Sequence, residues 1–399
     1  MIFLKLKLLF TFILVNDVVS YAQPLADESK VLSKLLPPVP SFAEIANKHG
    51  FKCEEYNVTT SDGYILHLFR IPGEVKRPVF LMHGVLDTAD AFILREEDSL
   101  ALTLARKGYD VWAGNNRGNR YSRHHVTLNP NKDTRFWNYT FHEMGTRDLP
   151  AMIDLVLDRT GQSQLSAVAH SEGTTIFYVL GATKPEYNSK IKVLASLAPI
   201  AHLQHTRGIL PFLIQTAPQL NIILEDLNYQ EVVGFNSNIR ALIRWICEVP
   251  GTGYSLCYEG LISQLIGFDT FELGPKIFTT IIEHYPAGTS KKNLLHYAQV
   301  GRRKSFAQYD YGIGNIRQYG SRTPPEYDLS KVTFDIGLYL GANDFVSTIK
   351  DVDIIKKQLP NVVDYQILAY PLWNHFDHLY AKDLPKYLLR HVLKLLRNY

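Results

Sequence analysis

The segment Ala169–Gly173 constrains the fold of this 399-residue chain more than any other feature of the sequence. It reads Ala-His-Ser-Glu-Gly and lies between the apolar run Leu165–Val168 and the helix-like run Thr174–Leu180. Residues without bulk two places before and after Ser171 allow a sharp strand-to-helix turn that exposes the serine hydroxyl. The helix that begins beyond the serine favours negative charge that develops beside it. The segment therefore predicts a nucleophile elbow with Ser171 as the nucleophile.

Strand-like and helix-like segments alternate on both sides of this turn. Strands are expected over residues 65–71, 79–82, 109–113, 165–169, 191–197, 335–340 and 362–368. One helix is expected over 98–107, and another starts at Asp148, which has the residue type of an N-cap and is followed by Pro150 in the first turn. This alternation predicts an α/β fold with a mostly parallel sheet that is covered by helices on both faces.

The alternation stops after Pro199 and resumes at the strand over 335–340. Residues from about 202 to 327 are expected to be mainly helical, without a clear strand, and they include strongly apolar stretches such as Leu242–Ile246. An apolar helical insertion between two core strands is typical of a cap over an apolar pocket. An ordinary packed helical subdomain has the same composition, so both interpretations stay open.

A serine nucleophile needs a base that accepts its proton and an acid that orients the base. Where a nucleophile elbow is present, both follow the serine along the chain, the acid first, each in a loop at the carboxyl end of a strand. Asp344 follows the strand over 335–340 and His375 follows the strand over 362–368, so they are predicted to be the acid and the base. Order and placement favour them over the other candidates, which are Asp351, Asp353 and Asp377 for the acid and His378 for the base.

The negative charge that develops on the substrate oxygen during the reaction is stabilised by two backbone N–H donors, which together form an oxyanion hole. One donor is predicted at Glu172, the residue after the nucleophile. The other is predicted at Val85, in the loop that follows an early core strand, with Leu86 as the alternative. His83 in the same loop is expected to fix the loop by hydrogen bonding.

The first 22 residues have the pattern of a secretory signal peptide. Lys5 and Lys7 precede a short apolar core, and Ser-Tyr-Ala at 20–22 supplies a small-x-small cleavage site. No later stretch has about 18 consecutive apolar residues, so no transmembrane segment is expected. The formal net charge of +3 is close to balance and does not indicate nucleic-acid binding.

The three cysteines, Cys53, Cys247 and Cys257, are consistent with one disulfide and one remaining thiol. Cys247 and Cys257 are the favoured pair because they lie close in sequence. No Cys-x-x-Cys motif or nearby histidine pair accompanies them, so no metal site is predicted. Asn57 and Asn138 begin glycosylation motifs and are predicted to be modified in a secretory pathway.

Taken together, these residues resemble the animal acid lipases, the α/β-hydrolases that include gastric lipase, lysosomal acid lipase and insect gut lipases. The resemblance runs from about Pro40 to the C-terminus and depends on residues 60–64, 81–86, 108–112, 116–119, 148–150, 169–175, 286–290 and 374–377. It implies an α/β-hydrolase domain over 23–399 with residues near 202–327 as the cap and lid. It also implies a triad of Ser171, Asp344 and His375, and it matches the pairing of Cys247 with Cys257.

The resemblance implies hydrolysis of triacylglycerols or cholesteryl esters at a lipid–water interface, without a metal or an organic cofactor. The expected destination is the extracellular space, including a gut lumen, or alternatively the lysosome. A short-chain carboxylesterase would keep the same triad, and a lipid-binding or storage protein would keep the fold without the catalysis. Oligomeric state is not predicted.

Two residues of the elbow depart from the family pattern, which typically reads Gly-His-Ser-Gln-Gly. Ala169 adds one methyl group near a strained turn, and we expect the turn to tolerate it. Glu172 keeps its backbone N–H, but an ionised carboxylate beside the oxyanion would oppose it. We therefore expect weaker catalysis or catalysis favoured at acidic pH, unless the carboxyl group is protonated or directed into solvent.

Overall fold

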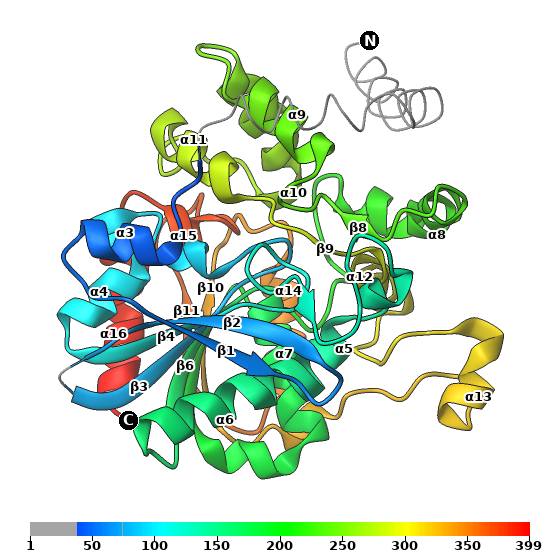
Figure 1. The fold of residues 1–399 in the computed structure, drawn as a ribbon, viewed down its shortest axis with the longest axis horizontal. Coiled ribbons are helices and arrows are strands. Elements are labelled where there is room, and N and C mark those ends of the chain that lie inside the picture. Colours follow the sequence, from blue (N-terminus) through cyan, green and yellow to red (C-terminus); the bar gives the residue numbers. More distant parts are fainter. Residues whose placement is uncertain (1–37, 74) are drawn as a thin grey trace.

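The computed structural model describes residues 38–73 and 75–399, and the predicted signal peptide lies outside the described residues. A central sheet of nine strands has helices packed around it (Figure 1). Its strands are β1 (Glu54–Thr59), β2 (Tyr64–Ile71), β3 (Val75–Met82), β4 (Tyr109–Gly114), β5 (His124–His125), β6 (Leu165–His170), β7 (Ile191–Leu197), β10 (Asp335–Leu340) and β11 (Val362–Ile367). They are arranged in the order β1-β2-β4-β3-β6-β7-β10-β11, with β5 paired to β2.

Every neighbouring pair from β4 through β3, β6, β7 and β10 to β11 is parallel, so the mostly parallel sheet predicted from the sequence is confirmed. Within this sheet, antiparallel pairing is confined to β2, which pairs with β1, β4 and β5. Strand β1 was not predicted, because this edge strand alternates only between half-buried and exposed residues. Such a strand has no fully apolar face from which a period of two could be read.

Both faces of the sheet are buried, because successive side chains of a strand point to opposite faces. In β3, Val79 and Leu81 belong to one hydrophobic core, whereas Phe80 and Met82 belong to the other. The first core is covered by α3 (Phe42–Lys48), α4 (Leu100–Arg106), α15 (Asp377–Tyr380) and α16 (Arg390–Arg397). The second is covered by α5 (Phe141–Glu143), α6 (Leu149–Thr160), α7 (Glu172–Thr183) and α14 (Ile349–Gln358).

Residues between β7 and β10 form a group of helices, most of which lie over one end of the sheet in Figure 1, and their buried side chains join the two cores of the sheet. They are α8 (Leu210–Asp226), α9 (Asn238–Cys247), α10 (Ser263–Ile266), α11 (Pro275–His284), α12 (Lys291–Arg303) and α13 (Asn315–Tyr319). A short antiparallel pair, β8 (Glu231–Val232) with β9 (Thr289–Ser290), also occurs there, although no strand was expected. The role of residues 202–327 as a cap stays a prediction.

The predicted disulfide between Cys247 and Cys257 is present, and it joins the end of α9 to the following helical turn. Cys53 is the free thiol. None of the helices in the described part of the chain combines the length and the apolar character needed to cross a bilayer.

Asp148 occupies the predicted position at the start of α6, but its side chain does not cap the helix. Its Oδ1 instead accepts a hydrogen bond from Arg117 Nε at 2.8 Å. Both side chains are excluded from water, with exposed fractions of 0% and 1%. The predicted N-cap position is therefore confirmed, but the carboxylate binds Arg117 and not the helix N–H groups, because a buried guanidinium needs a carboxylate partner.

We expect Arg117→Ala to lower the free energy of unfolding by about 3–5 kcal/mol, because Asp148 would be left as a buried charge without its partner. Urea unfolding at neutral pH measures the change. The matched control is Lys190→Ala, which removes the partly exposed ion pair with Asp154 and should cost about 0–1 kcal/mol. Equal losses in the two variants would contradict the expectation.

Candidate active site

Ser171 lies at the turn between β6 and α7 with a φ of 51°, which is rare for a residue other than glycine. The turn is held by the Ser171 N–H, which donates to Leu197 O at 3.0 Å. Gly173 is required because a Cβ at this position would lie 2.3 Å from Met82 O. Ala169, in contrast, is an ordinary strand residue of β6 and packs in a hydrophobic core, so its extra methyl group lies outside the strained turn.

The structure brings together the three side chains that were predicted to form a triad. His375 Nε2 lies 2.9 Å from Ser171 Oγ, and His375 Nδ1 lies 2.8 Å from Asp344 Oδ2. Ser171, His375 and Asp344 are 5%, 6% and 0% exposed. Such an arrangement allows the histidine to accept the serine proton while the carboxylate holds the imidazole in one tautomer.

The environment of Asp344 favours its ionised form. Its Oδ1 accepts the backbone N–H groups of Val346 and Ser347, each at 2.8 Å, which leaves Oδ2 for His375. Burial by itself would raise the pKa of Asp344, but the charge and the hydrogen bond of His375 outweigh it and hold the pKa below its ordinary value. An ionised carboxylate at this position keeps the proton of the imidazole on Nδ1 and leaves Nε2 as the acceptor.

The competing candidates for the acid and the base have other partners. Asp351 accepts from His205, and Asp353 accepts from the Tyr365 hydroxyl. Asp377 accepts the backbone N–H of Asn374, and His378 Nδ1 lies 3.1 Å from Asn374 O.

The loop predicted to supply the second oxyanion donor lies directly against the elbow. A Cβ at Gly84 would be 3.3 Å from Ser171 Cβ. Residues 84–87 form a turn closed by the Asp87 N–H, which donates to Gly84 O at 3.3 Å, and Leu86 takes a φ of 61° within it. We call residues 84–87 the oxyanion turn.

His83 holds the oxyanion turn, as expected from the sequence. Its Nε2 accepts the Asn116 N–H at 3.0 Å, so its Nδ1–H is the donor to Gly84 O at 2.8 Å. Burial lowers the pKa of His83 to about 4, which keeps the ring neutral and this tautomer in place at higher pH.

His170 was not singled out from the sequence, although it lies inside the elbow. Its Nε2 lies 3.0 Å from the backbone oxygen of His375, so the ring links the elbow to the loop of the predicted base. Burial and the neighbouring histidines hold its pKa well below the ordinary value, which favours the neutral ring.

The Glu172 side chain is buried, so the alternative in which it is directed into solvent does not hold. Its Oε1 accepts from Asn293 Nδ2 at 2.5 Å, and Asn293 Oδ1 accepts the Phe141 N–H. Burial raises the pKa of Glu172 to about 7 even though the hydrogen bond from Asn293 lowers it. The carboxyl group is therefore neutral under acidic conditions.

A cavity of about 380 Å³ lies away from these residues, lined by charged and polar side chains that include Asp62, Arg117, Arg147 and Lys292. Its lining does not include Ser171, Asp344 or His375. Within the described residues, no group of three histidine, cysteine or acidic side chains is placed to hold a metal ion.

A serine on a strand-to-helix turn, followed along the chain by an acid and a histidine that reach it from later loops, defines an α/β-hydrolase site. Residues 42–96 match the family described as the partial α/β-hydrolase lipase region, and residues 77–225 match the α/β-hydrolase fold family.

Lipases from several animals are among the relatives that are similar to the chain. Lipase 1 of Drosophila melanogaster is 36% identical over 362 residues, which cover 89% of this chain and 79% of the relative. Gastric triacylglycerol lipase of Rattus norvegicus is 34% identical, over 87% of this chain and 89% of the relative. Lipase member K of Homo sapiens is 33% identical, over 90% of this chain and 91% of the relative. The chain therefore belongs to the animal acid lipase family and is a carboxylic ester hydrolase of the lipase type, which confirms the resemblance inferred from the sequence.

A solved structure of a thermophilic esterase from Thermogutta terrifontis has a TM-score of 0.51 at 15% identity, and covers 86% of this chain and 98% of its own. At this identity the likeness supports the fold alone.

Glu172→Gln tests the protonation of the buried carboxyl group. The folded-state pKa of about 7 lies above the ordinary value of 4.5, so the stabilisation from the proton is complete below pH 4.5 and is lost as pH rises through 7. Relative to the variant, the wild-type free energy of unfolding should fall by on the order of 3 kcal/mol across this range.

The wild-type to variant ratio of kcat/KM should fall in the same range of pH, because an ionised Glu172 opposes the oxyanion. Urea unfolding and hydrolysis of a soluble ester, each followed over pH in wild type and in the variant, measure the two effects. Wild-type and variant curves that run parallel over pH would contradict both.

Proposed function

We propose that this protein is a lipase of the secretory pathway that hydrolyses triacylglycerols or cholesteryl esters with Ser171 as nucleophile, His375 as base and Asp344 as acid. The observation that carries the proposal is the continuous contact from Ser171 Oγ through His375 to Asp344, at 2.9 Å and 2.8 Å, in a site nearly excluded from water. The names of relatives, which include gastric triacylglycerol lipase, support the substrate class.

In the proposed reaction, Ser171 Oγ attacks the ester carbonyl carbon while His375 Nε2 accepts the hydroxyl proton. The backbone N–H groups of Val85 and Glu172 bind the resulting oxyanion. When the tetrahedral intermediate collapses, the carbon–oxygen bond to the alcohol breaks and His375 returns its proton to the leaving oxygen. Water, activated by the same histidine, then attacks the acyl-enzyme and releases the fatty acid.

The residues between β7 and β10 are proposed to act as the cap and lid, over about 202–327. In the present arrangement Ser171 is almost fully covered, so a long acyl chain reaches it only after part of the cover moves. Helices α8 and α9 carry large exposed apolar side chains, among them Ile222 and Trp245. An apolar surface of this kind supports contact with a lipid–water interface.

The proposed destination is the extracellular space, with the lysosome as the alternative. The Cys247–Cys257 disulfide supports an oxidising compartment. Asn57 and Asn138 are both exposed, which supports glycosylation at the two predicted positions.

Substitutions in the triad test the mechanism. Ser171→Ala should lower kcat/KM by more than about 10⁴-fold, and Asp344→Asn should lower kcat by about 10⁴-fold because the imidazole tautomer is no longer fixed. Asp353→Asn is the matched control, since Asp353 accepts a hydrogen bond from Tyr365 and was a competing candidate for the acid. Rates of hydrolysis of a soluble butyrate ester measure the changes. Substantial activity in Ser171→Ala would overturn the assignment of the nucleophile.

Emulsified triolein, a cholesteryl ester and soluble butyrate esters distinguish a lipase from a short-chain carboxylesterase. We expect the protein to hydrolyse the long-chain emulsions, because the exposed apolar side chains of α8 and α9 favour an interface over a dissolved ester. Titration of released fatty acid measures the three rates, with Ser171→Ala as the blank. Activity confined to the butyrate esters would favour the carboxylesterase, and no activity together with no labelling of Ser171 by a fluorophosphonate would favour a binding protein.

A further inference from the structure

Two contacts connect the oxyanion turn to the helical insertion. The Ala287 N–H donates to Leu86 O at 2.6 Å, directly in the turn. His284, the last residue of α11, places Nδ1 2.9 Å from Oδ2 of Asp90. Asp90 belongs to the short helix η1 (Ala89–Phe92), which begins two residues after the turn.

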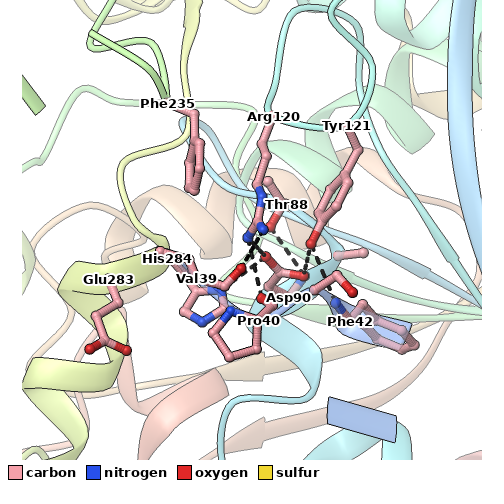
Figure 2. Close-up of polar contacts among 12 residues, drawn as sticks. Val39, Pro40, Phe42, Thr88, Asp90, Arg120, Tyr121, Phe235, Glu283 and His284 are labelled. Atoms are coloured by element: carbon pink, nitrogen blue, oxygen red, sulfur yellow. Dashed lines mark hydrogen bonds and ion pairs between the residues drawn. The ribbon is translucent and has the colours of Figure 1, made fainter. Parts of the chain in front are cut away.

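Asp90 is fully buried and receives its hydrogen bonds from two separate parts of the chain (Figure 2). Arg120 Nη1 at 3.2 Å and the Tyr121 hydroxyl at 2.8 Å come from the loop after β4. Because a carboxylate oxygen only accepts, the Nδ1–H of His284 is the third donor and the only one of the three that comes from the insertion. A buried carboxylate is stable only where such donors are present, so they determine where η1 lies.

Two of the donors to Asp90, Arg120 and Tyr121, form further hydrogen bonds with the backbone of residues 39–42. Arg120 Nη2 donates to Val39 O at 2.7 Å, and the Tyr121 hydroxyl accepts the Phe42 N–H at 3.3 Å, as Figure 2 shows. Tyr121 is therefore fixed to the body of the domain. The hydrogen bonds of Arg120 fix it there too, while its guanidinium also lies over the ring of Phe235 from the insertion, 4.4 Å from the ring centroid. His284 is instead fixed to α11, so any movement of α11 changes the donor set of Asp90.

The opposite side of the oxyanion turn is fixed to the helix that follows the base. Asp87 Oδ2 accepts from the Tyr380 hydroxyl at 3.2 Å, and Tyr380 ends α15, which begins two residues after His375. The turn therefore lies between the helix of the base on one side and α11 on the other.

We propose that Asp90 is a positioning residue for the oxyanion turn, and that the His284 contact makes the geometry of the turn depend on the position of α11. The inference rests on the proposed function, in which the Val85 N–H binds the oxyanion. When α11 and the residues that follow it to Ala287 move, Asp90 loses a donor and Leu86 loses its bond to Ala287, so the N–H groups of Val85 and Glu172 no longer converge on one point. The oxyanion hole is thereby complete only when α11 is seated.

His284→Ala, His284→Asn and Asp90→Asn test the proposal, with His205→Ala as the matched control. His205 Nδ1 lies 2.8 Å from Asp351 Oδ1, so it forms a second histidine–carboxylate contact between the insertion and the core, away from the oxyanion turn. Steady-state hydrolysis of a soluble butyrate ester gives kcat and KM, and the rate of fluorophosphonate labelling of Ser171 reports on the same hole. Thermal unfolding verifies that each variant is folded.

We expect His284→Ala to lower kcat and the labelling rate by at least about tenfold with little change in KM, because a displaced donor weakens binding of the transition state and not of the ground state. Asp90→Asn should change kcat in the same direction. His284→Asn keeps an N–H close to the position of Nδ1 and should recover most of the loss. His205→Ala should leave kcat near the wild-type value.

A kcat near wild type in folded His284→Ala would overturn the proposal even if Asp90→Asn does not fold. A loss of equal size in His205→Ala, or no recovery in His284→Asn, would overturn it as well. Failure of the proposed function gives a different result, because Ser171→Ala would then remain active or wild type would hydrolyse none of the esters.

Discussion

Parallel, in-register pairing of four central strands is the constraint on which the site depends. Met82 pairs with Ala169, Ala169 pairs with Ser196, and Leu197 pairs with Tyr339, so β3, β6, β7 and β10 end at the same edge of the sheet. Loops that follow these strands therefore meet although they are far apart in the chain. The elbow, the oxyanion turn and the loop of Asp344 all begin within a few residues of this edge, and their separation is determined by the sheet.

Burial favours the neutral form of several titratable groups around the site, whereas Asp344 favours its ionised form. Burial lowers the pKa of neighbouring histidines and raises the pKa of neighbouring carboxyl groups, which favours the neutral form in each case. The affected residues are His83, His170 and His378 among the histidines and Asp87 and Glu172 among the acids. Asp344 is the exception, because His375 and two backbone N–H groups compensate for its burial. The negative charge of the site is thus concentrated on the side of the histidine that faces away from Ser171.

The central strands of the sheet were predictable because they are buried on both faces and read as apolar runs between turn residues. The predicted limits of the strands over 191–197 and 335–340 agree with β7 and β10. Local sequence patterns did not predict the contacts of side chains whose partners lie far away along the chain. Asp148 has the residue type and position of a helix cap, yet its carboxylate binds Arg117, which lies 31 residues earlier in the chain. Asn293 and its contact with Glu172 carried no sequence signal, since asparagine at the start of a helix is common.

The sequence by itself determined the strand-to-helix turn at Ser171, the order of the acid and the base after it, and the disulfide between two nearby cysteines. The turn and the disulfide follow from backbone conformation and short spacing, which a few neighbouring residues specify, and the placement of Asp344 and His375 follows from the strand that precedes each of them. Tertiary structure alone decided that Glu172 is buried against Asn293, 121 residues away, and that His284 reaches Asp90 across 194 residues. Such contacts depend on how the helices after β7 pack on the finished sheet, and no local pattern encodes that packing.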